Sequence, residues 1–159
     1  MSQNLYHKII ESPVGTLKLM ATDKALVAIK FVKNEAAGKN KSTENSILAK
    51  AADQLAEYFS GKRKSFDLPL LADGTTFERK VWDTLNGVGY GTTVTYSKIA
   101  KKLGDINKVR AVGKANGQNP IPIIIPCHRV IGANNKLTGY AGGIERKRWL
   151  LQHEGALLL

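Results

Sequence analysis

This chain of 159 residues has little of several residue types on which common functional sites depend. It contains one cysteine and three histidines, which excludes an internal disulfide and every Cys-x-x-Cys motif, and no metal site is expected. No apolar run approaches the roughly 20 residues that span a bilayer, and residues 1–8 lack the apolar segment of a secretion signal. These absences favour a cytoplasmic protein in a reducing environment, with neither a metal nor a membrane as partner.

Acidic side chains are also few, at 13 against 24 lysines and arginines, and the net charge is +11 with neutral histidines. Residues 73–159 carry 13 basic and 6 acidic side chains, whereas residues 1–72 carry 11 and 7. Such an excess is typical of proteins that bind nucleic acid. On charge alone, a cationic surface that serves only solubility explains it equally well. The hydrophobic content of 43% supports a packed core.

The hydrophobic pattern of the first 72 residues predicts a small α/β unit. Three short apolar runs separated by turn residues favour an antiparallel meander, and a polar surface loop and an amphipathic helix should follow. A further edge strand is expected before the second unit, limited by a proline. The strands are expected at 5–10, 16–21, 25–32 and 66–70, the loop at 33–45 and the helix at 47–59, ended by Gly61.

From residue 73 onward the pattern becomes helical. Apolar residues recur at helical spacing over 77–85. A short helix is expected over 95–103, stopped by Gly104, and a second one from Asp105 or Asn107 to Gly117. Two short helices joined by a glycine-containing turn in a basic segment favour a helix-turn-helix.

The second of these helices has two contrasting faces. One arc is apolar except for an asparagine, and the opposite arc combines two cations with two glycines. Glycine inside a helix costs about 1 kcal/mol relative to alanine, so the pattern favours a close approach by a bulky partner such as nucleic acid. A weak helix with a solvated basic side is the alternative. The apolar arc holds Val109, Val112, Ala115 and Asn116, and the basic arc holds Arg110, Gly113, Lys114 and Gly117.

The single cysteine, Cys127, stands at the end of a proline-bracketed apolar run, directly before His128 and Arg129. Two neighbouring cations can lower the pKa of a thiol and make it a nucleophile. Cysteine is also a common small apolar core residue, and by itself Cys127 would favour that interpretation.

Several short motifs resemble, in order and spacing, those of the O6-alkylguanine-DNA alkyltransferases, also called methylated-DNA–protein-cysteine methyltransferases, of the bacterial stand-alone type. Residues 126–130 read Pro-Cys-His-Arg-Val and match the active-site signature of that family. The resemblance covers residues 77–155. The flanking motifs are Asn-Pro at 119–120, Tyr-Ala-Gly-Gly at 140–143, Trp-Leu-Leu at 149–151 and His-Glu-Gly at 153–155.

The resemblance implies an α+β fold. A small RNase H-like α/β domain over 1–72 would precede a helical domain of winged-helix, helix-turn-helix type over 73–159. It also implies a reaction, in which O6-alkylguanine is flipped out of double-stranded DNA and its alkyl group passes irreversibly to cysteine. Each molecule would act once, as a monomer and without a cofactor.

The resemblance assigns roles to individual residues. Cys127 would accept the alkyl group, His128 would act as base through a water, and Glu154 would orient the histidine. Tyr96 would donate a proton to the leaving base, and Asn119 would tie the recognition helix to the active-site loop. Arg110 would fill the gap left by the flipped base. Further DNA contacts are expected from Thr95, Gly113, Lys114, Gly117 and Arg129, and a base pocket from Tyr140, Ala141, Gly142 and Lys147.

Without the resemblance, the same residues have plainer interpretations. Tyr96 would be a core residue of the helix-turn-helix, and Arg110 a phosphate contact. Glu154 would be an exposed carboxylate near a chain end, and Lys147 part of a basic helix face. Ala141 departs from vertebrate members, which carry serine there, so a backbone donor would have to replace that hydroxyl.

Two other functions compete with alkyl transfer. A non-catalytic binder of alkylated DNA resembles the same family but lacks the acceptor cysteine, which this chain retains. A Cys–His hydrolase would turn over repeatedly and would not need the basic, glycine-containing helix.

Overall fold

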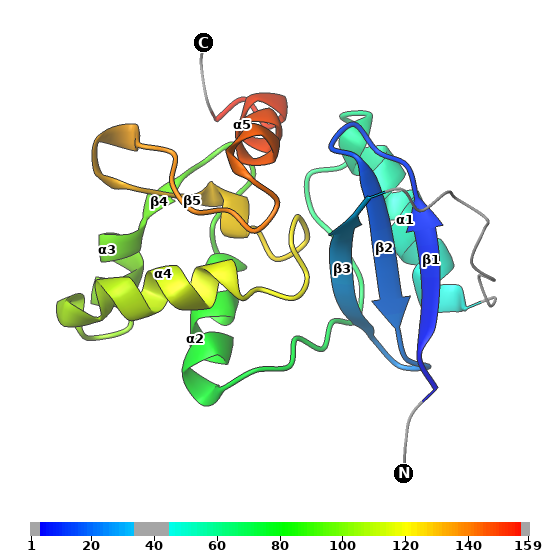
Figure 1. Ribbon diagram of the computed structural model, residues 1–159, viewed down its shortest axis with the longest axis horizontal. Coiled ribbons are helices and arrows are strands. Elements are labelled where there is room, and N and C mark those ends of the chain that lie inside the picture. The colour runs from blue at the N-terminus through cyan, green and yellow to red at the C-terminus, as the bar shows by residue number, and fades with distance from the viewer. Residues whose placement is uncertain (1–3, 34–44, 157–159) are drawn as a thin grey trace. The chain divides into compact units, whose positions relative to one another are not determined.

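The computed structural model describes residues 4–33 and 45–156. It divides the chain into two compact units, Met1–Asp73 and Gly74–Leu159. Figure 1 shows a sheet with one long helix in the first unit and a set of shorter helices in the second. Each unit has its own buried apolar side chains.

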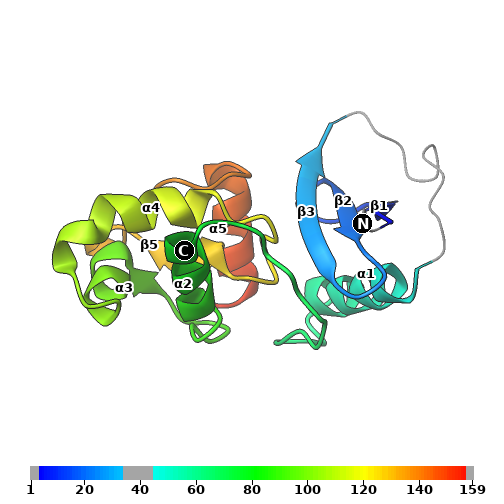
Figure 2. The ribbon, with the colours of Figure 1, turned by 90° about the horizontal axis from the view of Figure 1, so that it is seen from below.

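The N-terminal unit is built on an antiparallel meander in the order β1-β2-β3. Alternation places Leu17, Leu19 and Ala21 of the middle strand on the buried side, where all three are fully inaccessible. Helix α1 covers one face of the sheet, as Figure 2 shows from below. The elements are β1 (Tyr6–Ile10), β2 (Thr16–Ala21), β3 (Leu26–Val32) and α1 (Ser46–Phe59), which confirms the three predicted strands and the helix.

The predicted edge strand at 66–70 is wrong. The segment contacts the sheet through a single parallel bridge between Leu70 and Leu26, and the carbonyl of Pro69 accepts from the amide of Leu26 at 2.8 Å. Proline has no amide hydrogen to donate, so the pairing stops after one residue. Most of the predicted polar loop, residues 34–44, lies outside the described residues.

The C-terminal unit combines helices with one short parallel pair of strands. Helix α2 begins with a capping box between Thr75 and Glu78, which satisfies two free amides at its start. Its Trp82 donates from Nε1 to the carbonyl of Ala115 at 2.9 Å, fixing α2 against α4. The elements are α2 (Thr76–Leu85), β4 (Val94–Thr95), α3 (Tyr96–Lys102), α4 (Val109–Gly117), β5 (Val130–Ile131) and α5 (Ile144–His153).

The two central helices have the predicted helix-turn-helix connection, with one correction. Gly104, at a φ of 95°, follows α3 and allows the sharp reversal. Asp105 caps a 3-10 turn, η1 (Ile106–Lys108), and α4 begins only at Val109. The predicted start of the second helix near Asp105 or Asn107 therefore belongs to this tighter turn.

Helix α5 was not delineated by the sequence pattern. Gly143 precedes it at a φ of 92°, and its buried residues are Lys147, Leu150 and Leu151. A buried lysine on the same face as Leu150 and Leu151 breaks the amphipathic pattern that predicts helices. No helix within 4–33 and 45–156 is both long and apolar enough to cross a bilayer.

Candidate active site

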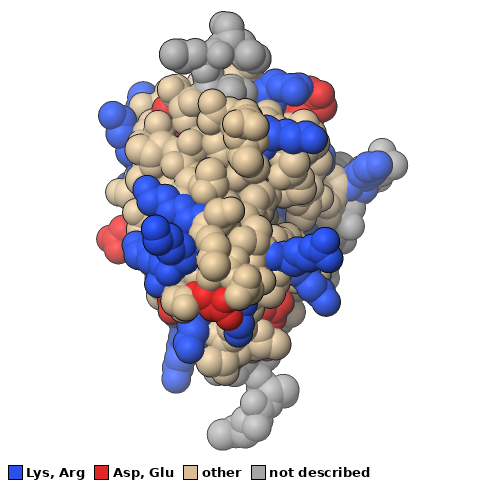
Figure 3. Space-filling view, turned by 90° about the vertical axis from the view of Figure 1, so that its left-hand side faces the viewer, with Lys and Arg blue, Asp and Glu red and all other residues tan. Residues whose placement is uncertain are grey.

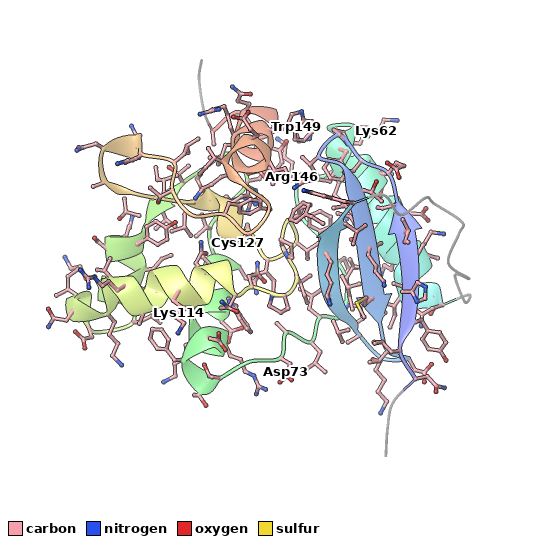
Figure 4. The ribbon with its side chains drawn as sticks, in the orientation of Figure 1. Lys62, Asp73, Lys114, Cys127, Arg146 and Trp149 are labelled. Atoms are coloured by element: carbon pink, nitrogen blue, oxygen red, sulfur yellow. The ribbon has the colours of Figure 1, made fainter. Side chains whose placement is uncertain are left out.

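The segment that leads to Cys127 is a rigid, buried loop. Every residue from 121 to 130 is buried, and Ile123 has a φ of 75°, where a β-branched side chain is rarely found. Asn119 closes the loop, because its Oδ1 accepts from the amide of Ile121 at 3.0 Å and its Nδ2 donates to the carbonyl of Ile125 at 2.8 Å. The loop therefore holds the cysteine in one place, inside the C-terminal unit (Figure 4).

Asn116 ties the same loop to helix α4. Its Nδ2 donates to the carbonyl of Cys127 at 3.2 Å, and its side chain is buried. The sequence pattern placed Asn116 on the apolar arc of the helix without giving it a role. A polar side chain on a buried helix face needs a hydrogen-bond partner. An asparagine among the apolar residues of this arc is therefore the sequence feature that indicates a structural role.

A short 3-10 turn, η2 (Cys127–Arg129), presents three consecutive functional side chains. Cys127 is 2% exposed and His128 is fully buried. Nε2 of His128 donates to Oε2 of Glu154 at 2.7 Å. Glu154 is buried at the end of α5, so the structure brings together these residues from 26 positions apart.

Arg129 shares the same carboxylate. Its Nε donates to Oε1 of Glu154 at 2.8 Å, its Nη2 donates to Oε2 at 3.1 Å, and its Nη1 donates to the carbonyl of Val88 at 2.6 Å. The guanidinium is thus turned inward and only 8% of the side chain is exposed. The expected DNA contact of Arg129 would require a surface position that this side chain does not have.

Burial determines the protonation of the cysteine and the histidine. It raises the pKa of Cys127 to about 11, against the opposing effects of the Asn119 hydrogen bond and the Lys147 cation. It lowers the pKa of His128, although Glu154 acts in the opposite direction. The resting site therefore holds a neutral thiol beside a neutral imidazole.

The hydrogen bond to Glu154 also fixes the tautomer of His128. An ionised carboxylate only accepts, so the proton sits on Nε2 and Nδ1 keeps its lone pair. Nδ1 is buried and has no hydrogen-bond partner among the described residues. The imidazole can accept one proton there, which is the chemistry of a general base.

A second cluster joins Tyr96, Thr138 and Lys147. The hydroxyl of Tyr96 donates to the carbonyl of Thr138 at 3.1 Å. Nζ of Lys147 donates to the same carbonyl at 2.6 Å and to that of Val130 at 2.5 Å. Burial lowers the pKa of this lysine to about 8. Lys147 thus fastens β5 to the segment before Tyr140 and does not lie on a basic surface.

The predicted base-pocket motif follows this cluster. Tyr140 is buried, and its pKa is raised well above the usual value by burial and by the nearby Cys127. Ala141 is exposed, and the carbonyl of Gly142 accepts from Nη1 of Arg146 at 2.9 Å. The motif therefore runs from the buried cysteine outward to the surface.

The burial pattern of α4 confirms its two predicted faces. Val112, Ala115 and Asn116 are buried, whereas Arg110, Lys114 and Gly117 are exposed. A Cβ atom at Gly113 would stand 3.9 Å from the ring of Tyr96, an ordinary contact. Figure 3 shows Lys and Arg side chains gathered around a largely uncharged strip on one face of the molecule.

Thr95 has a local role as the N-cap of α3. Its Oγ1 accepts from the amide of Lys98 at 3.1 Å, and its side chain is half-buried. Among the residues at 4–33 and 45–156, no group of three or more His, Cys, Asp or Glu side chains is arranged to hold a metal ion.

Comparison with known proteins identifies the family to which this site belongs. Residues 76–156 match the family described as 6-O-methylguanine DNA methyltransferase, DNA binding domain, and residues 5–72 match its ribonuclease-like domain. The chain belongs to this family. The predicted resemblance and the α+β fold class are thereby confirmed.

Individual relatives agree along nearly the whole chain. A methylated-DNA–protein-cysteine methyltransferase of Methanosarcina acetivorans is 46% identical over 159 residues, covering 96% of this chain and 99% of that one. A crystal structure of the Mycobacterium tuberculosis O6-methylguanine methyltransferase has a TM-score of 0.85 at 41% identity, covering 96% and 94% of the two chains. A crystal structure of Mycobacterium tuberculosis OGT in complex with DNA has a TM-score of 0.84 at 43% identity, covering 94% of this chain and 92% of that one.

The raised pKa of Cys127 predicts a slow reaction with small electrophiles. With a pKa of about 11, only roughly one thiol in ten thousand is ionised at pH 7. Iodoacetamide should therefore label native Cys127 slowly at pH 7, and the rate should keep rising up to pH 10. Peptide mass spectrometry measures the rate, with urea-unfolded protein as control. A plateau between pH 8 and 9 in the native protein would contradict the buried, neutral thiol.

Proposed function

We propose that this member of the family repairs double-stranded DNA by moving the alkyl group of O6-alkylguanine to Sγ of Cys127, once per molecule. The observation that carries the proposal is the buried array of Cys127, His128 and Glu154, with Nδ1 of the histidine free to accept a proton. The C–O bond to the base breaks and a C–S bond forms. The thiol proton passes through a water to Nδ1, and the Tyr96 hydroxyl gives a proton to the base, which leaves as guanine; the proton held by His128 then replaces that of Tyr96 through water, so no net charge remains.

The protonation states support a reaction that begins only when substrate is bound. A thiolate is the soft nucleophile that displacement at a saturated carbon requires. The resting thiol is neutral, so its proton must be taken by His128 as the carbon approaches. Glu154 steadies the imidazolium that forms, following the logic of a catalytic triad.

Arg129 acts on this array from the far side of the carboxylate. It contacts neither the thiol nor a surface where DNA could lie, so we assign it a positioning role in place of the expected DNA contact. Its charge offsets that of Glu154, and together with burial it keeps the pKa of His128 low. A neutral histidine at physiological pH is what a base needs.

The flipped base binds in a pocket next to the thiol of Cys127. Tyr140, Ala141 and Gly142 form one wall, and Lys147 joins the segment before this wall to β5 through the carbonyls of Thr138 and Val130. The hydroxyl of Tyr96 turns from the carbonyl of Thr138 to the leaving base as its proton donor. Asn119 keeps the loop of the nucleophile in register with α4.

DNA lies against the exposed face of α4, where Arg110, Lys114 and Gly117 are accessible. Arg110 enters the stack and occupies the place of the extruded nucleotide, because extrusion costs a few kcal/mol. Gly113 and Gly117 allow close approach of the DNA, and Thr95, the N-cap of α3, makes a further contact to it. The protein works as a cytoplasmic monomer, without a metal, in domains of residues 1–72 and 73–159.

The central prediction concerns the mass of the protein after reaction. Incubation with a duplex containing O6-methylguanine should add one methyl group per chain, confined to the peptide that holds Cys127. Intact-protein and peptide mass spectrometry measure both quantities. Cys127→Ala should gain no mass while it still binds the duplex. An unchanged wild-type mass with the lesion intact would refute alkyl transfer and leave a non-catalytic binder of damaged DNA.

Arg110→Ala should separate flipping from chemistry. Since the arginine compensates an extrusion cost of a few kcal/mol, repair of duplex DNA should slow by about tenfold to a hundredfold. The reaction with free O6-benzylguanine, which needs no flipping, should stay near the wild-type rate. Lys114→Ala is the matched control, because it removes a cation from the same face and should weaken only binding. Equal losses on both substrates in Arg110→Ala would refute the role.

Replacing Arg129 should move the acid limb of the pH–rate profile. Without the guanidinium, the uncompensated carboxylate of Glu154 raises the pKa of His128, so activity is lost at a higher pH than in wild type. At pH 6.5, Arg129→Met should react with free O6-benzylguanine about tenfold more slowly, with partial recovery at pH 8. Glu154→Gln should shift the limb in the opposite direction.

The Arg129 series includes a control for folding. Arg129→Lys keeps the charge but not the paired hydrogen bonds, so its acid limb should lie between those of wild type and Arg129→Met. It replaces Arg129→Met as the test variant if Arg129→Met does not fold. Near-ultraviolet circular dichroism checks each variant. An acid limb that stays in place in folded Arg129→Met or Arg129→Lys would contradict the positioning role.

A further inference from the structure

A cavity of about 280 Å³ lies in the C-terminal unit and is lined by none of the residues assigned to alkyl transfer. Its walls come from the end of α2, the loop that follows it, strand β4 and one side of α3. The volume is near the lower limit of small-molecule sites. The cavity is thus large enough for a small polar ligand.

The lining of this cavity is cationic. It includes Lys98 and Lys102 and contains no aspartate or glutamate. The two lysines are four residues apart on α3, so they lie on one side of the helix, next to the buried Ile99 that also lines the cavity. Neither lysine has an ion-pair partner among the described residues. Both ammonium groups are therefore available to one anion.

Neutral donors stand beside the lysines. Thr93 lines the cavity, and its hydroxyl and amide have no hydrogen-bond partner in the described part of the chain; the same holds for the amide of Gly89. Loop amides next to glycine, together with lysines and hydroxyls, form the usual surroundings of a bound phosphate. A carboxylate could use fewer of these donors than a phosphate with its three or four oxygens.

The loop that carries these donors is held in shape before any ligand binds. The amide and Oγ1 of Thr92 both donate to the carbonyl of Gly89, at 3.1 and 2.6 Å. The carbonyl of Val88, another lining residue, accepts from Arg129 at 2.6 Å. A preformed site loses little freedom on binding, which favours affinity even for a small ligand.

We infer that this cavity binds a phosphate group, carried either by the DNA backbone or by a free phosphate compound. Lys98, Lys102 and Thr93 hold the phosphate oxygens, and Val88 and Val94 give apolar contact to the attached sugar or ester. The DNA source rests on the proposed function. It agrees with the position of α3, since the first helix of a helix-turn-helix crosses the DNA backbone. The free source is independent of alkyl transfer.

The first experiment titrates ¹⁵N-labelled protein with inorganic phosphate and with deoxyribose 5-phosphate, using sodium chloride at equal ionic strength as control. The amide signals of Gly89 and Thr93 should shift and saturate. In the double variant Lys98→Gln/Lys102→Gln the apparent affinity should fall at least about tenfold. Lys101→Gln is the matched control, because this lysine is exposed on the same helix and does not line the cavity.

The second experiment measures binding of an unmodified duplex as a function of salt. If a backbone phosphate occupies the cavity, the slope of log K against log salt should be smaller in the double variant by roughly 0.9 for each phosphate that is no longer neutralised. Lys101→Gln should keep the wild-type slope. An equal change in Lys101→Gln would mean general electrostatic attraction and would overturn the DNA source.

The two arms together decide the inference. Saturating amide shifts with an unchanged salt slope assign the cavity to a free phosphate compound, and a changed slope specific to the double variant assigns it to DNA. The inference is overturned if neither effect occurs, or if the double variant keeps the amide shifts and the slope of wild type. Methyl transfer by the wild-type protein, measured in the same preparation, shows separately whether the proposed function holds.

Discussion

The carboxylate of Glu154 is the group on which the geometry of the active site depends. It accepts from His128 and twice from Arg129, and it stands at the end of α5, far along the chain from η2. A buried carboxylate is tolerated only where charge and hydrogen bonds compensate its desolvation. Glu154 therefore holds His128 and Arg129 in place, and the loop at Val88 is attached to this group through Arg129.

The geometry of a 3-10 turn explains why adjacent residues in η2 act in different directions. With three residues per turn, successive side chains diverge by about 120°. The thiol of Cys127 therefore does not face the imidazole of His128 directly, and a water between them is the natural proton path. Nε2 is committed to Glu154, so only Nδ1 can serve this path.

Much of this arrangement could be predicted from the sequence, for physical reasons that differ by region. Alternating residues around Leu17 and Leu19 specify strands, because one face of the sheet is buried. The signature around Cys127 placed the nucleophile through its family resemblance. The resemblance also named Glu154 and Lys147 as site residues, but the burial of these two charged side chains could not be predicted from their polar stretches of sequence. Their burial depends on tertiary partners that no local sequence pattern indicates: the carbonyls of Val130 and Thr138 for Lys147, and His128 and Arg129 for Glu154.

The burial of Cys127 affects how long an unreacted molecule stays active. A molecule that is spent by a single reaction must keep its one reactive atom intact while it waits, among peroxides, disulfides and reactive metabolites that consume exposed thiolates. A protonated thiol on a residue that is only 2% exposed is a poor target for all of them. Burial thereby protects the thiol of unreacted molecules from oxidation. The number of lesions that a cell can repair at one time equals its number of unreacted molecules.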